Sequence, residues 1–183
     1  MNQINIKIGG FGGQGIILAG YILGKAASIF DKKYATLTQS YGPESRGGAC
    51  STQIIVGEEQ VDYPEVIHPD ILLIMSQEAF DKFTPDLQKG GVLIYDEDLA
   101  EPTNNLGKTT KIYSIPATRY AEELGKKVVA NIIMLGFFTA VSGIITSGAI
   151  EGSIRSSMSD KFIDLNIKAF NRGYETGLNR VKK

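Results

Sequence analysis

The hydrophobic and polar positions follow two alternating patterns along the chain. Short β-branched runs recur, and longer segments with apolar residues three and four positions apart separate them. This alternation is typical of a sheet with helices on its faces, so we predict a single α/β, Rossmann-like domain over residues 1–183 with a mostly parallel sheet. The expected strands of that sheet are Ile4–Ile8, Tyr34–Thr38, Ile71–Met75, Val92–Tyr95 and Lys111–Ser114.

Two further strands are expected to pair with each other as a hairpin. The runs Ser51–Val56 and Gln60–Tyr63 flank the short connection Gly57-Glu58-Glu59. A short connection that contains glycine between two such runs is typical of a β-hairpin. We therefore expect an antiparallel hairpin to be added to the parallel sheet.

Segments of helical period fill the rest of the chain. Ile16–Phe30 carries small residues on one side, which allows close packing on a sheet, and Pro116 suits the first turn of a helix that runs to Leu124. Val128–Ile145 is the longest apolar stretch, but its polar residues and glycines favour a buried helix of an α/β domain over a membrane span. The last three helices are expected to begin at Val128, Ser147 and Asp160.

The composition argues against nucleic acid, a membrane surface and a metal ion as binding partners. The chain has 183 residues, 43% of them hydrophobic, and a formal net charge of −1, which gives no electrostatic footprint for nucleic acid or a membrane surface. The single cysteine, Cys50, and the single histidine, His68, have no companions at metal-ligand spacing. We expect a cytoplasmic protein without a secretory signal or a metal site of its own, in which Cys50 has a packing role and Asp96-Glu97-Asp98 is a solvated turn.

A glycine-rich turn is the first candidate for chemistry. Gly10-Phe11-Gly12-Gly13-Gln14-Gly15 lies between the first strand and the first helix, where free N–H groups of the helix can face an anion. The letters fit G-x-G-x-x-G, although glycines also occur where a strand simply turns tightly into a helix. The second strand ends in Gln39 and Ser40 without the acid that holds a ribose, and no G-K-[S/T] follows the turn. An ordinary NAD-binding domain and a P-loop nucleotidase are therefore disfavoured.

A second candidate loop, Ser40–Gly48, follows the second strand. Arg46 offers a planar set of donors for phosphate or carboxylate, and Gly47 and Gly48 leave backbone N–H groups accessible beside it. The alternative is a surface loop in which Arg46 pairs with Glu44. Ligands of open α/β sheets lie beyond the carboxyl ends of the strands, so both loops are expected to face one crevice.

Together these segments resemble the gamma subunit of the 2-oxoacid:ferredoxin oxidoreductases. The resemblance covers nearly the whole chain and rests on G-G-x-G-G-Q-G at Gly9–Gly15 and S-Y-G-P-E-S-R-G-G at Ser40–Gly48. It continues in order through Val61–Pro64, Pro69-Asp70, Met75–Ala79 and Asn131–Gly136.

The resemblance implies one subunit of a complex that oxidatively decarboxylates a 2-oxoacid, joins the acyl group to coenzyme A and reduces ferredoxin or flavodoxin. Thiamine diphosphate is then held by alpha and beta subunits, and iron–sulfur clusters by partners that include a ferredoxin-like delta subunit. This chain has no cysteine cluster for iron, so we expect it to bind no cofactor alone and to be inactive alone. An isolated gamma subunit can also homodimerise through an apolar interface.

The implied contact with coenzyme A places candidate binding residues in both loops and assigns none as catalytic. The competing hypothesis is that the loops contact only the catalytic subunits. The resemblance implies basic residues before this loop in pyruvate-type members, and the lead Ile8-Gly9-Gly10-Phe11 lacks them. This favours 2-oxoglutarate or a branched-chain 2-oxoacid; we choose 2-oxoglutarate, with branched-chain 2-oxoacids and pyruvate as alternatives. A non-enzymatic coenzyme A-binding or nucleotide-binding scaffold is the alternative from another class. The candidate residues are Gly10, Gly12, Gly13, Gln14, Gly15, Ser40, Arg46, Gly47, Gly48 and Asn131.

Overall fold

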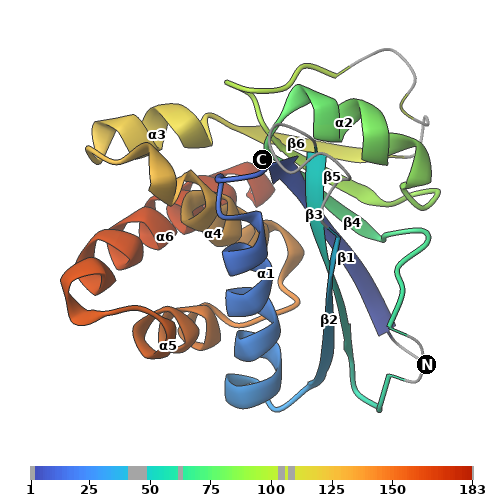
Figure 1. Ribbon diagram of the computed structural model, residues 1–183, viewed down its shortest axis with the longest axis horizontal. Coiled ribbons are helices and arrows are strands. Elements are labelled where there is room, and N and C mark those ends of the chain that lie inside the picture. Colours follow the sequence, from blue (N-terminus) through green and yellow to red (C-terminus); the bar gives the residue numbers. More distant parts are fainter. Residues whose placement is uncertain (1–2, 41–48, 62–63, 103–105, 107–109, 183) are drawn as a thin grey trace.

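A six-stranded sheet with helices on both faces forms the centre of the computed structural model (Figure 1). The structure describes residues 3–40, 49–61, 64–102, 106 and 110–182. The strand order is β2-β3-β1-β4-β5-β6. The strands are β1 (Gln3–Phe11), β2 (Tyr34–Ser40), β3 (Ala49–Gly57), β4 (Ile71–Ile74), β5 (Val92–Asp96) and β6 (Lys111–Ile115).

The sheet is mostly parallel, as the alternation of strands and helices predicts. β1, β4, β5 and β6 run in one direction, and β3 is antiparallel to both of its neighbours, β1 and β2. The α/β class and the antiparallel addition are thus confirmed. The expected partner of Ser51–Val56 is wrong, however, because Gln60 and Val61 lie outside any strand, and Asp62 and Tyr63 lie outside the described residues. β3 instead pairs with β1 on one side and with β2 on the other.

The helices divide unequally between the two faces of the sheet. α2 (Gln77–Phe83) covers one face, and α1, α4, α5 and α6 cover the other (Figure 1). β4 shows the division, since Leu72 and Ile74 pack with α2 whereas Ile71 and Leu73 pack in the larger core, as alternate residues of a strand must. The remaining helices are α1 (Ile16–Lys25), α3 (Ala117–Glu123), α4 (Ala130–Ser142), α5 (Ser147–Ser157) and α6 (Asp160–Val181), with a π-helical turn at Ala26–Phe30 and 3-10 turns at Thr84–Asp86 and Lys127–Val129.

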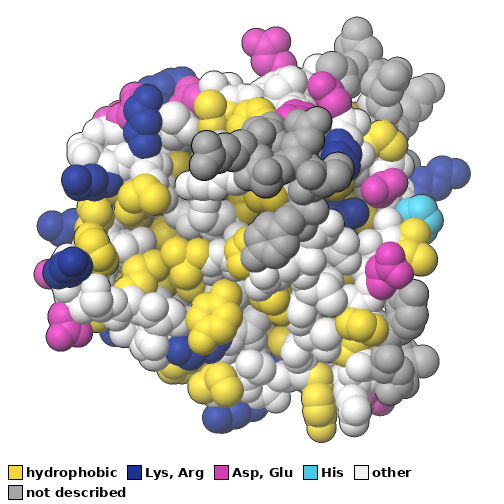
Figure 2. Space-filling view, in the orientation of Figure 1, with side chains coloured by type: hydrophobic (Ala, Val, Ile, Leu, Met, Phe, Trp, Pro, Cys, Tyr) yellow, Lys and Arg dark blue, Asp and Glu magenta, His cyan; other side chains and the backbone are white. Residues whose placement is uncertain are grey.

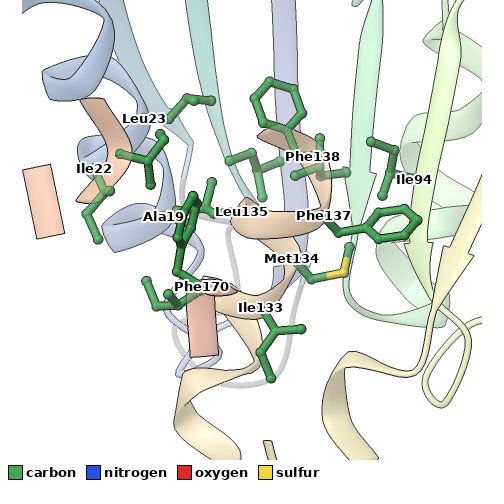
Figure 3. Close-up of a cluster of buried hydrophobic side chains, with 14 of the residues drawn as sticks. Ala19, Ile22, Leu23, Ile94, Ile133, Met134, Leu135, Phe137, Phe138 and Phe170 are labelled. Atoms are coloured by element: carbon green, nitrogen blue, oxygen red, sulfur yellow. The ribbon is translucent and has the colours of Figure 1, made fainter. Parts of the chain in front are cut away.

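α4 is the central helix of the larger core. All residues from Ala130 to Thr139 are buried, which confirms the expectation of a buried helix. Figure 3 shows Met134, Phe137 and Phe138 of α4 among side chains from α1, β5 and α6. No helix of the described residues is long and apolar enough to cross a membrane. This buried helix fixes the position of Asn131, one residue after its start.

Candidate functional site

The glycine-rich turn lies at the edge of the sheet where the parallel strands β1, β4 and β5 end. β1 continues through Gly10 to Phe11, and α1 begins at Ile16. Gly13 has φ of 96° and Gly15 has φ of 76°, in the left-handed region that favours glycine. Crevices at this edge are the usual ligand sites of open α/β sheets. The two glycines therefore allow the strand to turn into the helix at the expected place.

The side chain of Gln14 holds the turn together. Its Oε1 accepts a hydrogen bond from the backbone N–H of Phe11 at 2.6 Å, and its Nε2 donates to the carbonyl oxygen of Met75 at 2.7 Å. A Cβ at Gly10 would lie only 2.5 Å from this Oε1. The turn at the end of β1 is thereby tied to the residue that follows β4. Gln14 and Gly10 shape the turn, and a ligand role for either stays a prediction.

Asn131 holds the other end of the turn. Its Nδ2 donates to the carbonyl oxygen of Gly15 at 3.0 Å, and the residue is only 2% exposed. A Cβ at Gly15 would lie 2.3 Å from Nδ2. Asn131 thus contacts the glycine-rich turn, and a binding role for it stays a prediction. The first turn of α4 and the first turn of α1 are joined by this contact.

Between these two anchors, the backbone of Gly12 and Gly13 borders open space. Among the described residues, no heavy atom lies within 4 Å of a Cβ added to either glycine. A pocket of about 360 Å³ begins here and extends over the carboxyl ends of β4 and β5. It is lined by Gly13, Gln14, Met75, Leu99, Thr118, Lys127, Val128 and Ala130. The turn therefore presents free backbone to a cavity large enough for part of a ligand.

A second pocket, of about 550 Å³, lies on the other side of Val128. Gly15 and Leu18 form one wall, and the start of α6 forms another with Phe162. Lys126 lines this pocket and Lys127 lines the first one. Lys127 forms an ion pair with Glu122 at 2.7 Å, which raises the pKa of Lys127, whereas no ion pair joins Lys126 to another described residue. Two cations that sequence reasoning did not single out thus flank the glycine-rich turn.

The second candidate loop begins at the same edge of the sheet. Ser40 ends β2 and pairs with Ser51 of β3, which pairs in turn with Gly9 of β1. Two strand spacings of about 4.8 Å separate Ser40 from Gly9, so their backbones lie on the order of 10 Å apart. Arg46, Gly47 and Gly48 lie outside the described residues. Their binding roles, and that of Ser40, stay predictions.

Asp96, at the end of β5, has a role that the sequence did not indicate. The expectation of a solvated turn is wrong for this residue, which is fully buried. Its carboxylate accepts hydrogen bonds from the N–H groups of Ala117 and Thr118, at 3.1 and 3.0 Å, and from Thr118 Oγ1 at 2.6 Å. Burial raises the pKa of Asp96, and the hydrogen bond from Thr118 opposes that rise. Asp96 therefore anchors the start of α3 beside the first pocket.

The described residues contain no group of three His, Cys, Asp or Glu side chains that could hold a metal ion. Cys50 is 7% exposed and packs in the larger core, where burial raises the pKa of its thiol. His68 is exposed, and its Nδ1 lies 3.2 Å from the carbonyl oxygen of Asp86. In the described part of the chain, the groups that this edge of the sheet offers to a ligand are therefore mainly backbone N–H groups, Lys126, Lys127 and apolar walls.

Comparison with known proteins gives consistent results along the whole chain. Residues 5–176 match the family model described as pyruvate ferredoxin/flavodoxin oxidoreductase. The chain is 46% identical over 171 residues to the 2-oxoglutarate synthase subunit KorC of Methanocaldococcus jannaschii, covering 93% of this chain and 91% of KorC. It is 34% identical to the ketoisovalerate oxidoreductase subunit VorA of Methanothermobacter marburgensis over 93% of this chain but only 36% of VorA.

A solved structure agrees with these sequence relatives. The gamma subunit of a keto/oxoacid ferredoxin oxidoreductase from Geobacter sulfurreducens superposes with a TM-score of 0.83 at 39% identity. The match covers 96% of this chain and 99% of that one. The similarity therefore includes the sheet, both layers of helices and the glycine-rich turn.

Proposed function

We propose a function from one premise: the chain belongs to the pyruvate ferredoxin/flavodoxin oxidoreductase family. Within it, we propose that the chain is the gamma subunit of 2-oxoglutarate:ferredoxin oxidoreductase. That complex converts 2-oxoglutarate, coenzyme A and oxidised ferredoxin or flavodoxin into succinyl-CoA, carbon dioxide and the reduced acceptor. The observation that carries the proposal is the 46% identity to a 2-oxoglutarate synthase subunit, against 34% to a ketoisovalerate oxidoreductase subunit.

In this proposal the difficult chemistry takes place in other subunits. Alpha and beta subunits hold thiamine diphosphate, and a ferredoxin-like delta subunit holds iron–sulfur clusters. The donors found in the described part of this chain are backbone N–H groups and lysines, which suit an anionic group such as a phosphate better than a metal ion. The chain supplies no catalytic residue. It helps to form the path of coenzyme A and to assemble the complex.

The glycine-rich turn is the proposed contact with coenzyme A. A pyrophosphate or ribose phosphate is held well by N–H groups at the start of a helix and by nearby cations. Gly12 and Gly13 border open space, and Lys127 lines the same pocket as Gly13. Arg46 is the proposed charge partner from the second loop. The 2-oxoacid reacts elsewhere, so these residues do not select its side chain.

Substitution of Gly12 by alanine tests this contact with little effect on the fold. Because the added methyl group meets no atom of the described residues, we expect the stability to change by less than about 0.5 kcal/mol. A ligand held against the backbone would meet the methyl group, so the KM for coenzyme A should rise about tenfold in the assembled complex while kcat changes little. Gly148→Ala, at an exposed position of α5 where a Cβ would also meet no described atom within 4 Å, is the matched control. An unchanged KM in Gly12→Ala would contradict the contact.

Arg46→Ala separates coenzyme A binding from subunit docking. Loss of a phosphate partner should raise the KM for coenzyme A in a complex that remains fully assembled. If the loop contacts only the catalytic subunits, the same change loosens assembly and leaves the remaining intact complex kinetically normal. Subunit ratios after gel filtration, measured with the KM, distinguish the two results.

Recovery of the native complex tests the proposed function itself. The tagged chain is purified from its own cells without oxygen, and the eluate is assayed with coenzyme A, an artificial electron acceptor and a panel of 2-oxoacids. We expect thiamine diphosphate subunits, a ferredoxin-like subunit and reduction that depends on 2-oxoglutarate. Preference for a branched-chain 2-oxoacid or pyruvate would change the substrate. Recovery of the chain alone, with no 2-oxoacid activity, would favour a scaffold module.

A further inference from the structure

Helix α1 is hydrophobic on all sides although one side is exposed. Ile16–Phe30, which comprises α1 and the π-helical turn after it, contains a single charged residue, Lys25. A surface helix normally has polar residues on its outer face, and a helix that is hydrophobic all round is normally buried. The inner side of α1 is buried in the larger core. The outer side of α1 is therefore unusual, because it is apolar and yet exposed.

Three large apolar side chains form that outer side, which we call the α1 face: Leu18, Tyr21 and Ile29. They are 40%, 50% and 55% exposed, and their spacing of three and eight residues places them on one stripe of the helix. Figure 2 shows hydrophobic side chains gathered over α1 and over the helices beside it. Isolated exposed apolar residues are ordinary, but three on one helix face, with Lys25 between Tyr21 and Ile29, make a mainly apolar surface of the kind that indicates an interaction.

The α1 face lies between two hollows. Leu18 borders the pocket of about 550 Å³ that also includes Val128 and Phe162, which are 63% and 50% exposed. Tyr21 and Ile29 border a pocket of about 400 Å³ on the other side, next to Leu37 of β2. The face is thus a ridge between two apolar grooves. Such relief suits the core of a protein interface, where side chains of a partner fill the grooves.

The one charge near the ridge is already satisfied within the chain. Lys25 Nζ donates to the carbonyl oxygen of Ser156 at 3.0 Å and to Ser157 Oγ at 3.1 Å, near the end of α5. Its Nζ also lies 5.8 Å from the ring centroid of Tyr21. Burial of the α1 face would therefore leave the ammonium of Lys25 with two hydrogen-bond acceptors, neither of which is a carboxylate.

The comparisons indicate what kind of partner covers this surface. VorA contains a counterpart of nearly this whole chain, but the greater part of VorA lies outside the match. In that relative the gamma-type unit is covalently joined to a larger unit, so the two are permanent neighbours. A permanent interface between subunits is large and hydrophobic, unlike a transient one. A chain that is separate from its larger neighbour needs such an apolar face to remain attached.

We propose that the α1 face docks permanently on the subunit that corresponds to the remainder of VorA-type chains. This rests on the proposed function, because it requires that the chain be part of the oxidoreductase complex. The partner is a folded protein subunit that presents apolar side chains to both grooves. A second copy of this chain is the competing occupant, and the test separates the two.

The test is co-expression of the tagged chain with the other subunits, followed by measurement of the partner recovered per tagged chain. Tyr21→Glu places a carboxylate in the centre of the face and should lower recovery about tenfold, the loss expected for a large anchoring side chain. It should still fold, because a glutamate four residues before Lys25 favours the helix. Ile29→Lys is a second variant with the opposite charge. The matched control is Ile112→Glu, at a residue that is 44% exposed on β6, the edge strand at the other end of the sheet.

The expected result is full recovery by the wild type and by Ile112→Glu, and loss in both α1-face variants with thermal unfolding unchanged. Equal recovery by all four chains would overturn the proposal. Light scattering on the isolated chain would also overturn it if the wild type were a dimer, Tyr21→Glu a monomer, and partner recovery unaffected. If the wild-type chain recovers no oxidoreductase subunit, the proposed function is contradicted as well. Equal recovery by all four chains instead rejects only the role of the α1 face.

Discussion

Gln14 and Asn131 show how single side chains determine the shape of the glycine-rich turn. Each donates one hydrogen bond across the fold, to Met75 and Gly15 respectively, and each fills the space in which a Cβ of a nearby glycine would lie. Gly10 and Gly15 are therefore required by the fold, whereas Gly12 and Gly13 are open to a ligand. The motif letters are the same for all four glycines, but their physical roles differ.

Gly15 and Asn131 are expected to be energetically coupled. Gly15→Ala should cost about 3 kcal/mol of unfolding free energy, from the left-handed backbone and from the clash with Nδ2. Asn131→Ala should cost about 1 kcal/mol for the lost hydrogen bond. Because the shorter side chain makes room, Gly15→Ala should cost at least about 1 kcal/mol less in the Asn131→Ala background. Urea denaturation of the four chains measures this difference, and strict additivity would contradict the coupling.

Asp96 is expected to matter for stability far more than its neighbours in the same turn. Asp96→Ala removes the acceptor of two backbone N–H groups at the start of α3, and should cost about 3 kcal/mol. Arg119→Ala removes only an ion pair with Asp98 in which the arginine side chain is 59% exposed, and should cost less than about 1 kcal/mol. Thermal or chemical unfolding of both variants checks this order. Equal losses would show that the buried hydrogen bonds of Asp96 are not the main contribution.

These residues also show which side-chain contacts can be predicted from the sequence and which cannot. The hydrogen-bonding loop contact of Asn131 was predictable, because a lone amide in an apolar helix needs a polar partner. The burial of Asp96 was not predictable. An Asp-Glu-Asp run has the same sequence whether or not the N–H groups of a later helix donate to its first carboxylate. The two hydrogen bonds that the Gln14 side chain makes to Phe11 and Met75 were also not predicted. The second depends on Met75, which is 61 residues away in the chain.

At the level of elements, α4 and α6 pack with their backbones in close contact. A Cβ at Gly136 would lie 2.1 Å from the carbonyl oxygen of Phe170, and one at Gly173 would lie 1.9 Å from that of Ile133. The backbones of the two helices therefore touch where their glycines meet. This contact fixes α4 against α6 and, through Asn131, fixes the start of α1.

Gly136→Ala is expected to destabilise the chain by at least about 2 kcal/mol, because backbone atoms cannot move aside as a flexible side chain can. Gly148→Ala, also in a helix but in open space, should instead be neutral or stabilising by up to about 1 kcal/mol. Urea midpoints of the two variants test the contrast. A tolerated Gly136→Ala would mean that the helices can separate without loss.

The elements themselves were largely predictable from the sequence. Strands with continuous apolar runs, such as β4, and helices with clear period, such as α6, were placed correctly. α2 was missed because its seven residues are too few to establish a period, although Ser76 caps it through a hydrogen bond from Ala79 N–H. The hairpin was assigned wrongly because local turn chemistry does not reveal that β3 pairs between β1 and β2.

At the level of the whole molecule, the glycine-rich turn and the α1 face are adjacent. Gly15 ends the turn and Leu18, in the first turn of α1, belongs to the face. A partner that docks along α1 would therefore reach the edge of the proposed coenzyme A site. The sequence indicated the family through ordered motifs, but the exposed stripe emerged only when the fold showed which side of α1 is buried. Assembly and substrate access are thus expected to depend on one region of the chain.

The central claim is that this chain completes a 2-oxoglutarate oxidoreductase. The most direct measurement is reduction of ferredoxin by the other subunits, purified without the chain, before and after it is added back in the presence of 2-oxoglutarate and coenzyme A. We predict that activity is low without the chain, is restored as it approaches one copy per complex, and is highest with 2-oxoglutarate among the 2-oxoacids tested. Full activity without the chain, or no gain when it rebinds, would contradict the account.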